Sequence, residues 1–115
     1  KNVFVGGASQ GCCTVLHAIA TYKGPAVGGV LGTQGHLLSC TKWPENWAMS
    51  KTPVRIFNGL ADETMPWDDW VSSTFDPIRA TGCDLKIHTD EGVEHGDHEA
   101  EGRWVRSFLA EMLPR

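Results

Sequence analysis

Four short runs of apolar residues, each bounded by glycine, proline or polar residues, divide the chain into segments. Apolar runs of this length without polar alternation are typical of strands that are buried on both faces of a sheet. The predicted strands cover residues 3–5, 26–31, 53–58 and 85–89, and Gly6 and Gly7 end the first of them. Residues 32–52 show no regular period, so we expect a long irregular connection there.

Three other segments repeat apolar residues every three or four positions, which is the spacing of one helix face. The first predicted helix covers residues 12–22 and ends before Gly24 and Pro25. The second covers residues 67–81, where Pro77 should kink the helix or begin a new turn. The last helix has Asp97 as a candidate cap at its start. Its apolar face contains Trp104, Val105, Phe108, Leu109, Met112 and Leu113.

The alternation of strands and helices predicts an α/β fold with a mostly parallel sheet of about four strands and helices on both faces. A length of 115 residues is enough for one domain. A buried strand that begins almost at the first residue is more typical of the middle of a fold, so we expect the C-terminal part of a longer protein. In such sheets, functional residues gather beyond the carboxyl ends of the strands.

The composition of the chain argues against some classes of function and favours others. With 10 basic and 14 acidic residues the formal charge is −4, which argues against nucleic-acid binding. No apolar run approaches the roughly 20 residues of a membrane-spanning helix, and no signal segment is evident, so we expect a soluble protein without stable membrane insertion. The cysteines, at positions 12, 13, 40 and 83, form no CxxC pair. They favour reduced thiols in a cytoplasmic protein over a disulfide or redox role.

The first predicted strand is followed by a GxSxG sequence that leads directly into a helix. This context is the one in which a serine sits on a strained turn with its hydroxyl clear of the sheet. The turn needs small residues two positions before and after the serine, where the chain has Gly7 and Gly11. Ser9 is therefore the candidate nucleophile, and the N–H of Gln10 is placed to bind an oxyanion. The alternative is an ordinary serine that caps a glycine-rich turn.

The third and fourth predicted strands are each followed by a residue that suits such a serine. Asp62 follows the third strand, where its carboxylate can orient a histidine, and the alternative is that it only caps the turn before the next helix. Later acids that offer alternatives are Glu63, Asp68 and Asp69. His95 follows the fourth strand and is the candidate general base. We favour it over His98, which falls in the first turn of the last helix, and over His17 and His88, which are more simply structural or exposed.

The order Ser9, Asp62, His95 is that of α/β-hydrolases. Together with four sequence motifs, VFVGGASQG, QGHLL, FNGLADETMPW and DEGVEHG, it resembles the phospholipase/carboxylesterase family, which includes acyl-protein thioesterases. The resemblance covers nearly the whole chain and implies that residues 1–115 are one α/β-hydrolase domain without its N-terminal strands. Within QGHLL the chain departs from the family's SGxLP pattern at Gln34, His36 and Leu38.

The resemblance implies hydrolysis of carboxylic esters or thioesters through an acyl-serine, with no metal or organic cofactor. It assigns Ser9 as nucleophile, Asp62 as acid and His95 as base, with Gln10 as one oxyanion donor. Leu37, Leu38 and Trp67 are the expected substrate-binding residues. The loop over residues 33–47, which also contains Trp43 and Trp47, is expected either to line an acyl groove or simply to pack against the protein.

The family's HGxGD-like loop, which supplies a second oxyanion amide, has no counterpart in the sequence. Loss of one such donor typically costs about 10²- to 10³-fold in rate. Three functions of the chain therefore remain possible from the sequence: an esterase or thioesterase, a catalytically impaired fragment or binding module, and a peptidase or lipase of the same superfamily. The first strand is expected to expose a parallel edge through which the chain self-associates.

Overall fold

The structure, a computed structural model, describes residues 3–47, 49 and 51–112. Its centre is a four-stranded sheet in the order β1-β2-β3-β4, and every pair of neighbouring strands is parallel. The strands are β1 (Phe4–Ala8), β2 (Gly29–Thr33), β3 (Val54–Gly59) and β4 (Leu85–Asp90). The prediction of a mostly parallel sheet of about four strands is confirmed. The carboxyl ends of all four strands consequently lie at the same end of the sheet.

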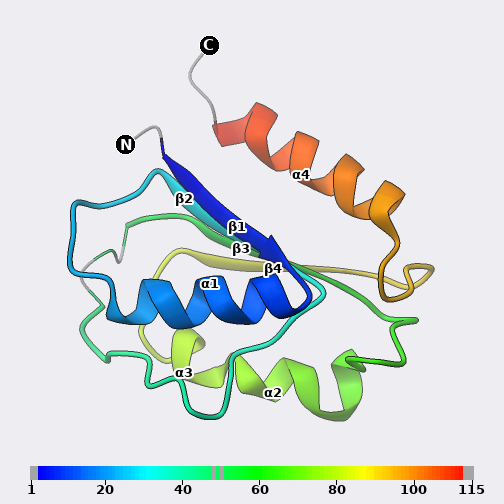
Figure 1. The fold of residues 1–115 in the computed structure, drawn as a ribbon, viewed down its shortest axis with the longest axis horizontal. Helices are drawn as coiled ribbons and strands as arrows, with labels where there is room; N and C mark the ends of the chain where they lie inside the picture. Colours follow the sequence, from blue (N-terminus) through cyan, green and yellow to red (C-terminus); the bar gives the residue numbers. More distant parts are fainter. Residues whose placement is uncertain (1–2, 48, 50, 113–115) are drawn as a thin grey trace.

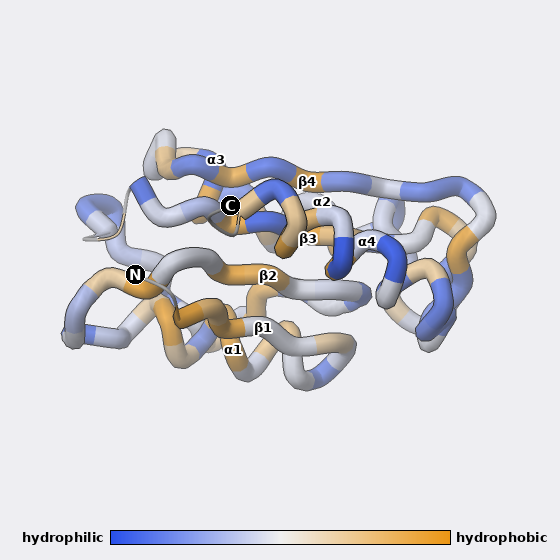
Figure 2. Tube along the Cα trace, turned by 90° about the horizontal axis from the view of Figure 1, so that it is seen from above, coloured by the Kyte–Doolittle hydropathy of each residue, from blue (hydrophilic) through white to orange (hydrophobic). Residues whose placement is uncertain are grey.

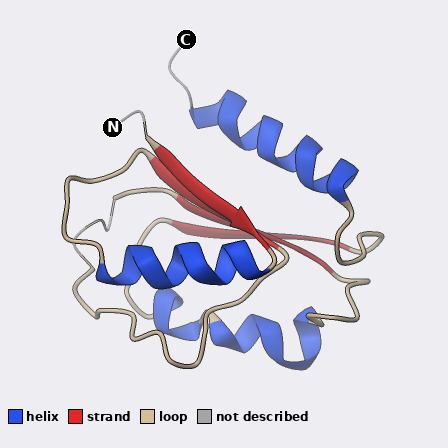
Figure 3. Cartoon of the chain, in the orientation of Figure 1, coloured by secondary structure: helices blue, strands red, loops and turns tan. Residues whose placement is uncertain are grey.

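Helices cover both faces of this sheet, as the sequence predicts (Figures 1 and 3). On one face lies α1 (Gln10–Thr21), together with α2 (Ser72–Thr74) and α3 (Asp76–Arg79). On the other face lies α4 (His98–Met112), which crosses the sheet alone. The described helix matches the predicted last helix, and Leu113 lies outside the described residues.

The larger part of the core lies on the α1 face, because most of the long apolar side chains point there. Leu16 of α1, Val30 of β2 and Ile56 of β3 are fully buried in it. The smaller cluster on the α4 face is built around Phe57, whose ring stacks on Trp104 with centroids 5.4 Å apart. Along β4, half-buried and exposed residues alternate, and much of this strand is hydrophilic in Figure 2.

The strand boundaries differ from the prediction in a way that concerns the glycines. Gly6 and Gly7 were expected to end the first strand, but both belong to β1 and pair with Leu31 and Gly32. At Gly6 a Cβ would lie 2.7 Å from the Leu31 side chain, so the residue is small because the two strands meet closely, and not because the strand stops. The second strand likewise begins three residues later than predicted and continues to Thr33.

The segment over residues 67–81 is broken where the sequence predicted a break. A π-helical turn, η1 (Trp67–Val71), leads into α2, and α3 starts a new turn with Pro77 in its first positions. Proline is tolerated there because the N–H that it lacks has no partner in the first turn of a helix. Asp97 caps α4 as predicted, since its Oδ1 accepts the N–H of Ala100 at 3.1 Å.

Between β2 and β3, the described residues form neither helix nor strand, as expected for this connection. Its two tryptophans are core residues: Trp43 and Trp47 are 8% and 6% exposed, and their rings lie 4.9 Å apart. The alternative of ordinary packing therefore holds for this pair. Among the described residues, no helix combines the length and the apolar character needed to cross a lipid bilayer.

Candidate functional site

Ser9 occupies the sharp turn between β1 and α1. Its backbone angles are φ 56° and ψ −119°, a combination that is rare for a residue with a side chain. Its N–H donates to the carbonyl of Thr33 at 2.8 Å, which ties the turn to the end of β2. The hydroxyl makes no capping hydrogen bond to α1. The alternative of a serine that serves as a helix cap is therefore wrong, and the Oγ is held out beyond the sheet.

The two glycines that flank Ser9 differ in what they do. A Cβ on Gly7 would lie 2.3 Å from the carbonyl carbon and oxygen of Gly11, so Gly7 is required by the close approach of β1 to α1. A Cβ on Gly11 would meet nothing within 4 Å. The expectation that both positions need a small residue is thus supported only for Gly7 by the described part of the chain.

His95 lies in the loop between β4 and α4, and its imidazole connects the other two candidate residues. Nε2 is 2.9 Å from the Oγ of Ser9, and Nδ1 is 2.7 Å from Oδ2 of Asp62. Because a carboxylate can only accept, Nδ1 carries the proton and Nε2 is left free to accept the hydrogen bond of the serine hydroxyl. The ring is 23% exposed, which leaves it open to solvent on one side.

Asp62 follows β3, and its side chain is completely buried. Oδ1 accepts the N–H groups of Thr64 at 2.9 Å and Met65 at 2.8 Å, while Oδ2 faces His95. The geometry is compatible with both interpretations of this residue, because one oxygen accepts N–H groups of the turn and the other accepts the hydrogen bond of the imidazole. The alternative acids, Glu63, Asp68 and Asp69, are exposed.

The remaining histidines lie away from this row. His17 accepts or donates at the hydroxyl of Thr41, 2.7 Å away. His88 stacks on Phe57 with centroids 5.5 Å apart, and His98 has a 91% exposed side chain in the first turn of α4. Gln10 is exposed as the first residue of α1, beside Ser9. Among the described residues, no group of three or more histidine, cysteine or acidic side chains is arranged to hold a metal ion.

A groove of about 550 Å³ is lined by Leu37 and Leu38, as expected, and by Trp70 and Pro77. It begins at His36, whose ring meets the Trp70 ring edge to face at 4.8 Å. Trp67, the third residue expected to bind substrate, does not line this groove, and its ring packs against Phe75 at 5.8 Å beside the core. The groove tryptophan is Trp70, which is 40% exposed. The helical spacing over residues 67–81 predicts that the Trp70 side chain lies on the apolar face of a helix, and it does not predict a groove there.

Gln34 was noted in the sequence only as a departure from a motif. In the structure it is 1% exposed, and its Oε1 accepts the N–H of Gly96, next to His95. A signal for it was present, since a long amide stands where the SGxLP pattern has a small serine. The pattern gave no means of telling which loop the amide would contact.

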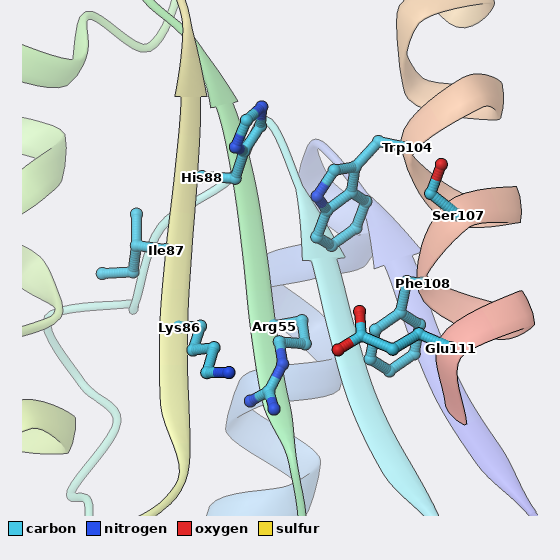
Figure 4. A pocket seen from close by; sticks show the side chains of 8 residues that line it. All are labelled: Arg55, Lys86, Ile87, His88, Trp104, Ser107, Phe108 and Glu111. Carbon is cyan, nitrogen blue, oxygen red and sulfur yellow. The ribbon is translucent and has the colours of Figure 1, made fainter.

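Two features of the molecule lie outside this row. A groove of about 320 Å³ separates α4 from β3 and β4, with Arg55 and Lys86 on the strands and Glu111 on the helix (Figure 4). Arg55 forms an ion pair with Asp84 at 3.2 Å. Cys12, at the start of α1, is completely buried, and burial together with the neighbouring Cys13 raises its thiol pKa from 9.0 to about 12. All four cysteines are free.

A family model described as Phospholipase/Carboxylesterase matches residues 1–113. The acyl-protein thioesterase 1 of Aspergillus fumigatus is 28% identical over 120 aligned residues, covering 99% of this chain and 48% of that protein.

Among solved structures, SOBER1 of Arabidopsis thaliana superimposes with a TM-score of 0.79 at 21% identity, over 97% of this chain and 53% of that one. The acyl-protein thioesterase 2 of Zea mays gives 0.75 at 20% identity, over 98% and 57%. At these identities the structures establish the fold, which is part of the α/β-hydrolase fold. The chain spans about half the length of the relatives that it matches.

Proposed function

Because the chain belongs to the phospholipase/carboxylesterase family, we propose that it is the part of a serine hydrolase that carries the catalytic triad, with carboxylic esters or thioesters as substrates. The observation that supports this most directly is the continuous row of hydrogen bonds from Ser9 through His95 to Asp62. Each of the three residues follows a different strand, and no element of secondary structure would place them together by itself.

The proposed reaction begins when His95 Nε2 accepts the proton of the Ser9 hydroxyl as Oγ attacks the substrate carbonyl carbon. The tetrahedral oxyanion that forms is stabilised by the N–H of Gln10 and by the amino-terminal end of α1. Protonated His95 then donates its proton to the leaving oxygen or sulfur, which departs as an alcohol or thiol and leaves the acyl group on Ser9.

Hydrolysis of the acyl-serine repeats these steps with water. His95 accepts a proton from the water molecule, whose oxygen attacks the acyl carbon, and then returns the proton to Oγ as the carboxylic acid leaves. Asp62 stabilises the imidazolium in both halves of the reaction, because its buried carboxylate accepts the hydrogen bond of the Nδ1–H group, which keeps its proton. Each group thus returns to its starting state after one turnover.

The groove beside His36 is the proposed site for the acyl chain. Its lining is largely apolar, and its residues, Leu37 and Leu38, follow Gly35 by two and three positions. A Cβ on Gly35 would lie only 2.7 Å from the carbonyl oxygen of Ser9, so the groove-lining segment starts in contact with the nucleophile's turn. The proposed location is the cytoplasm, where four free thiols remain reduced.

Labelling with a fluorophosphonate probe tests the proposal, since such probes react covalently with activated serines. The chain should be labelled in a 1:1 ratio, and Ser9→Ala should remove the label. Ser107→Ala makes the same chemical change on the exposed surface of α4 and is the matched control, which should label like the unaltered chain. Equal labelling of the unaltered chain and Ser9→Ala would overturn the proposal and favour a non-catalytic binding module.

A further inference from the structure

Gln34 occupies the turn at which β2 ends, between the two segments that hold Ser9 and His95. Its backbone N–H donates to the carbonyl of Phe57 at the end of β3, at 2.8 Å. Its φ is 53°, and Ser9 is the other non-glycine residue with a positive φ in the described part of the chain. Both strained residues therefore lie at neighbouring strand ends of the same site.

The side chain of Gln34 makes one hydrogen bond, in which Oε1 accepts the N–H of Gly96. Gly96 directly follows His95, and its φ of 82° is one that favours glycine. On the other side of the amide, Nε2 is buried and has no hydrogen-bond partner among the described residues. A buried unpaired donor typically costs about 1–3 kcal/mol, so this amide is poorly suited to a purely structural role.

The same turn also contacts Ser9. The carbonyl of Thr33 accepts the Ser9 N–H, and Gly35 packs against the Ser9 carbonyl oxygen. Asn58, at the end of β3, donates from Nδ2 to the carbonyl of Gly35 at 3.2 Å and fixes the turn from below. One short segment is thus bonded on one side to the turn of the nucleophile and on the other to the loop of the base.

We propose that Gln34 is a positioning residue for His95, whose amide oxygen holds Gly96 and thereby sets the imidazole against the Ser9 hydroxyl. The loop over residues 91–97 is otherwise held by the buried side chain of Val93, by the hydrogen bond from the Ala61 N–H to the Val93 carbonyl, and by the bonds of His95 to Asp62 and Ser9. The bond from Gln34 is the one that holds the residue directly after His95. This inference rests on the proposed function insofar as it concerns reaction rate. The hydrogen bond between Gln34 and Gly96 and its effect on the position of the imidazole do not depend on the proposed function.

Two substitutions of similar length separate the bond from the bulk of the side chain. Gln34→Met fills nearly the same volume, keeps the same backbone strain and removes the acceptor together with the unpaired Nε2. Gln34→Glu keeps an oxygen acceptor at the same place, because a carboxyl oxygen accepts an N–H hydrogen bond in either protonation state, so it can be compared at the pH at which the unaltered chain labels. A role in packing alone would be retained by both variants, whereas positioning requires the acceptor and is retained by Gln34→Glu only.

Three measurements are compared between the variants. The saturating rate constant for Ser9 labelling by a fluorophosphonate should fall about tenfold or more in Gln34→Met, while the half-saturation concentration and the thermal midpoint stay near those of the unaltered chain. Exchange of the Gly96 amide proton should become faster. The downfield Nδ1 proton resonance of His95, which reports its bond to Asp62, should broaden or shift in Gln34→Met and persist in Gln34→Glu.

The results that would overturn the inference are equally definite. Labelling and a His95 resonance that both remain unchanged in Gln34→Met would show that the amide fills space and does no more. A chain that fails to label at all would remove the proposed function, but the His95 resonance and the Gly96 exchange rate would still decide whether Gln34 positions the imidazole. The two failures are therefore distinguishable in one set of samples.

Discussion

The Nε2 of His95 lies 2.9 Å from the Oγ of Ser9, although 86 positions separate the two residues in the sequence. They also belong to loops that follow opposite edges of the sheet, since Ser9 follows β1 and His95 follows β4. Three strand spacings correspond to about 14 Å. The loop after β4 must therefore fold back across the end of the sheet, over β3 and β2, to bring the imidazole to the serine.

Removal of His95 or Asp62 should abolish Ser9 labelling but differ in its effect on stability. His95→Ala takes away a partly exposed ring and leaves one oxygen of Asp62 without its partner, so it should lower the free energy of unfolding by about 1 kcal/mol. Asp62→Ala takes away a buried carboxylate that accepts three hydrogen bonds and should lower it by about 2–3 kcal/mol, because the N–H groups of Thr64 and Met65 lose their partner. Urea denaturation of both variants measures the difference, and equal stability losses would contradict the dual role of Asp62.

Gly7→Ala and Gly11→Ala form a matched pair of opposite sign. The new methyl of Gly7→Ala would lie 2.3 Å from the Gly11 backbone, so β1 and α1 must separate, at a cost of about 2–4 kcal/mol. Gly11→Ala places its methyl in open space within α1 and should raise stability by about 0.5–1 kcal/mol, because alanine favours the helix and restricts the unfolded chain. Thermal unfolding followed by circular dichroism distinguishes them. Destabilisation by Gly11→Ala would mean that its small size matters after all.

The buried thiol of Cys12 should make stability depend on pH in alkaline solution. In the unfolded chain this thiol ionises near its ordinary pKa of 9.0, whereas in the fold its pKa is about 12, so above pH 9 the unfolded state loses the proton first. The free energy of unfolding should therefore fall by up to about 1.4 kcal/mol per pH unit between these values.

Comparison of the free energies of unfolding of the unaltered chain and Cys12→Ala between pH 8 and pH 10.5 isolates this contribution, because other titrating groups are common to both proteins. As a separate check on burial, a thiol reagent at pH 8 should modify the exposed Cys40 of the folded chain long before Cys12. An identical pH dependence in Cys12→Ala would rule out the thiol as its source.

Trp70→Ala should reduce hydrolysis of long acyl esters selectively. The tryptophan forms one wall of the proposed acyl groove, and loss of its apolar contact should lower kcat/KM for an octanoyl ester about tenfold relative to an acetyl ester. Tyr22→Ala is the control, since Tyr22 is equally 40% exposed but lies at the end of α1, away from the groove. A ratio of octanoyl to acetyl activity that is the same in both variants would place the acyl chain elsewhere.

The edge of the sheet at β1 is the proposed route of self-association. No strand pairs with the outer side of β1 in the described part of the chain, and an apolar groove of about 360 Å³ beside it is lined by Val3, Val5 and Val27, among others. We expect a sedimentation coefficient that rises with concentration, and Val3→Lys should suppress this rise because a charge at the edge opposes strand pairing. Thr14→Lys, on the exposed side of α1, is the control and should leave association unchanged.

The sequence by itself determined the architecture and the place of each candidate catalytic residue. Apolar runs and helical spacing indicate which residues become buried, and that is enough to give the order of strands and helices along the chain. Because all strands are parallel, their carboxyl ends gather at one end of the sheet, so a serine, an aspartate and a histidine after three strands were expected to meet. Ser9 and His95, the two residues that the sequence pairs as candidate nucleophile and base, are hydrogen-bonded in the structure.

Only the tertiary structure decided what depends on contacts between distant loops. The sequence offers four tryptophans in these segments, Trp43, Trp47, Trp67 and Trp70, and gives no means of telling which of them faces a groove. In the described part of the chain, Trp70 is the one that lines the groove with Leu38. Gln34 is buried, and its Oε1 accepts the N–H of Gly96, which lies 62 positions away in the sequence, a contact that no local pattern specifies. The period of apolar residues indicates which side chains become buried, whereas the packing of distant segments determines which residues they contact.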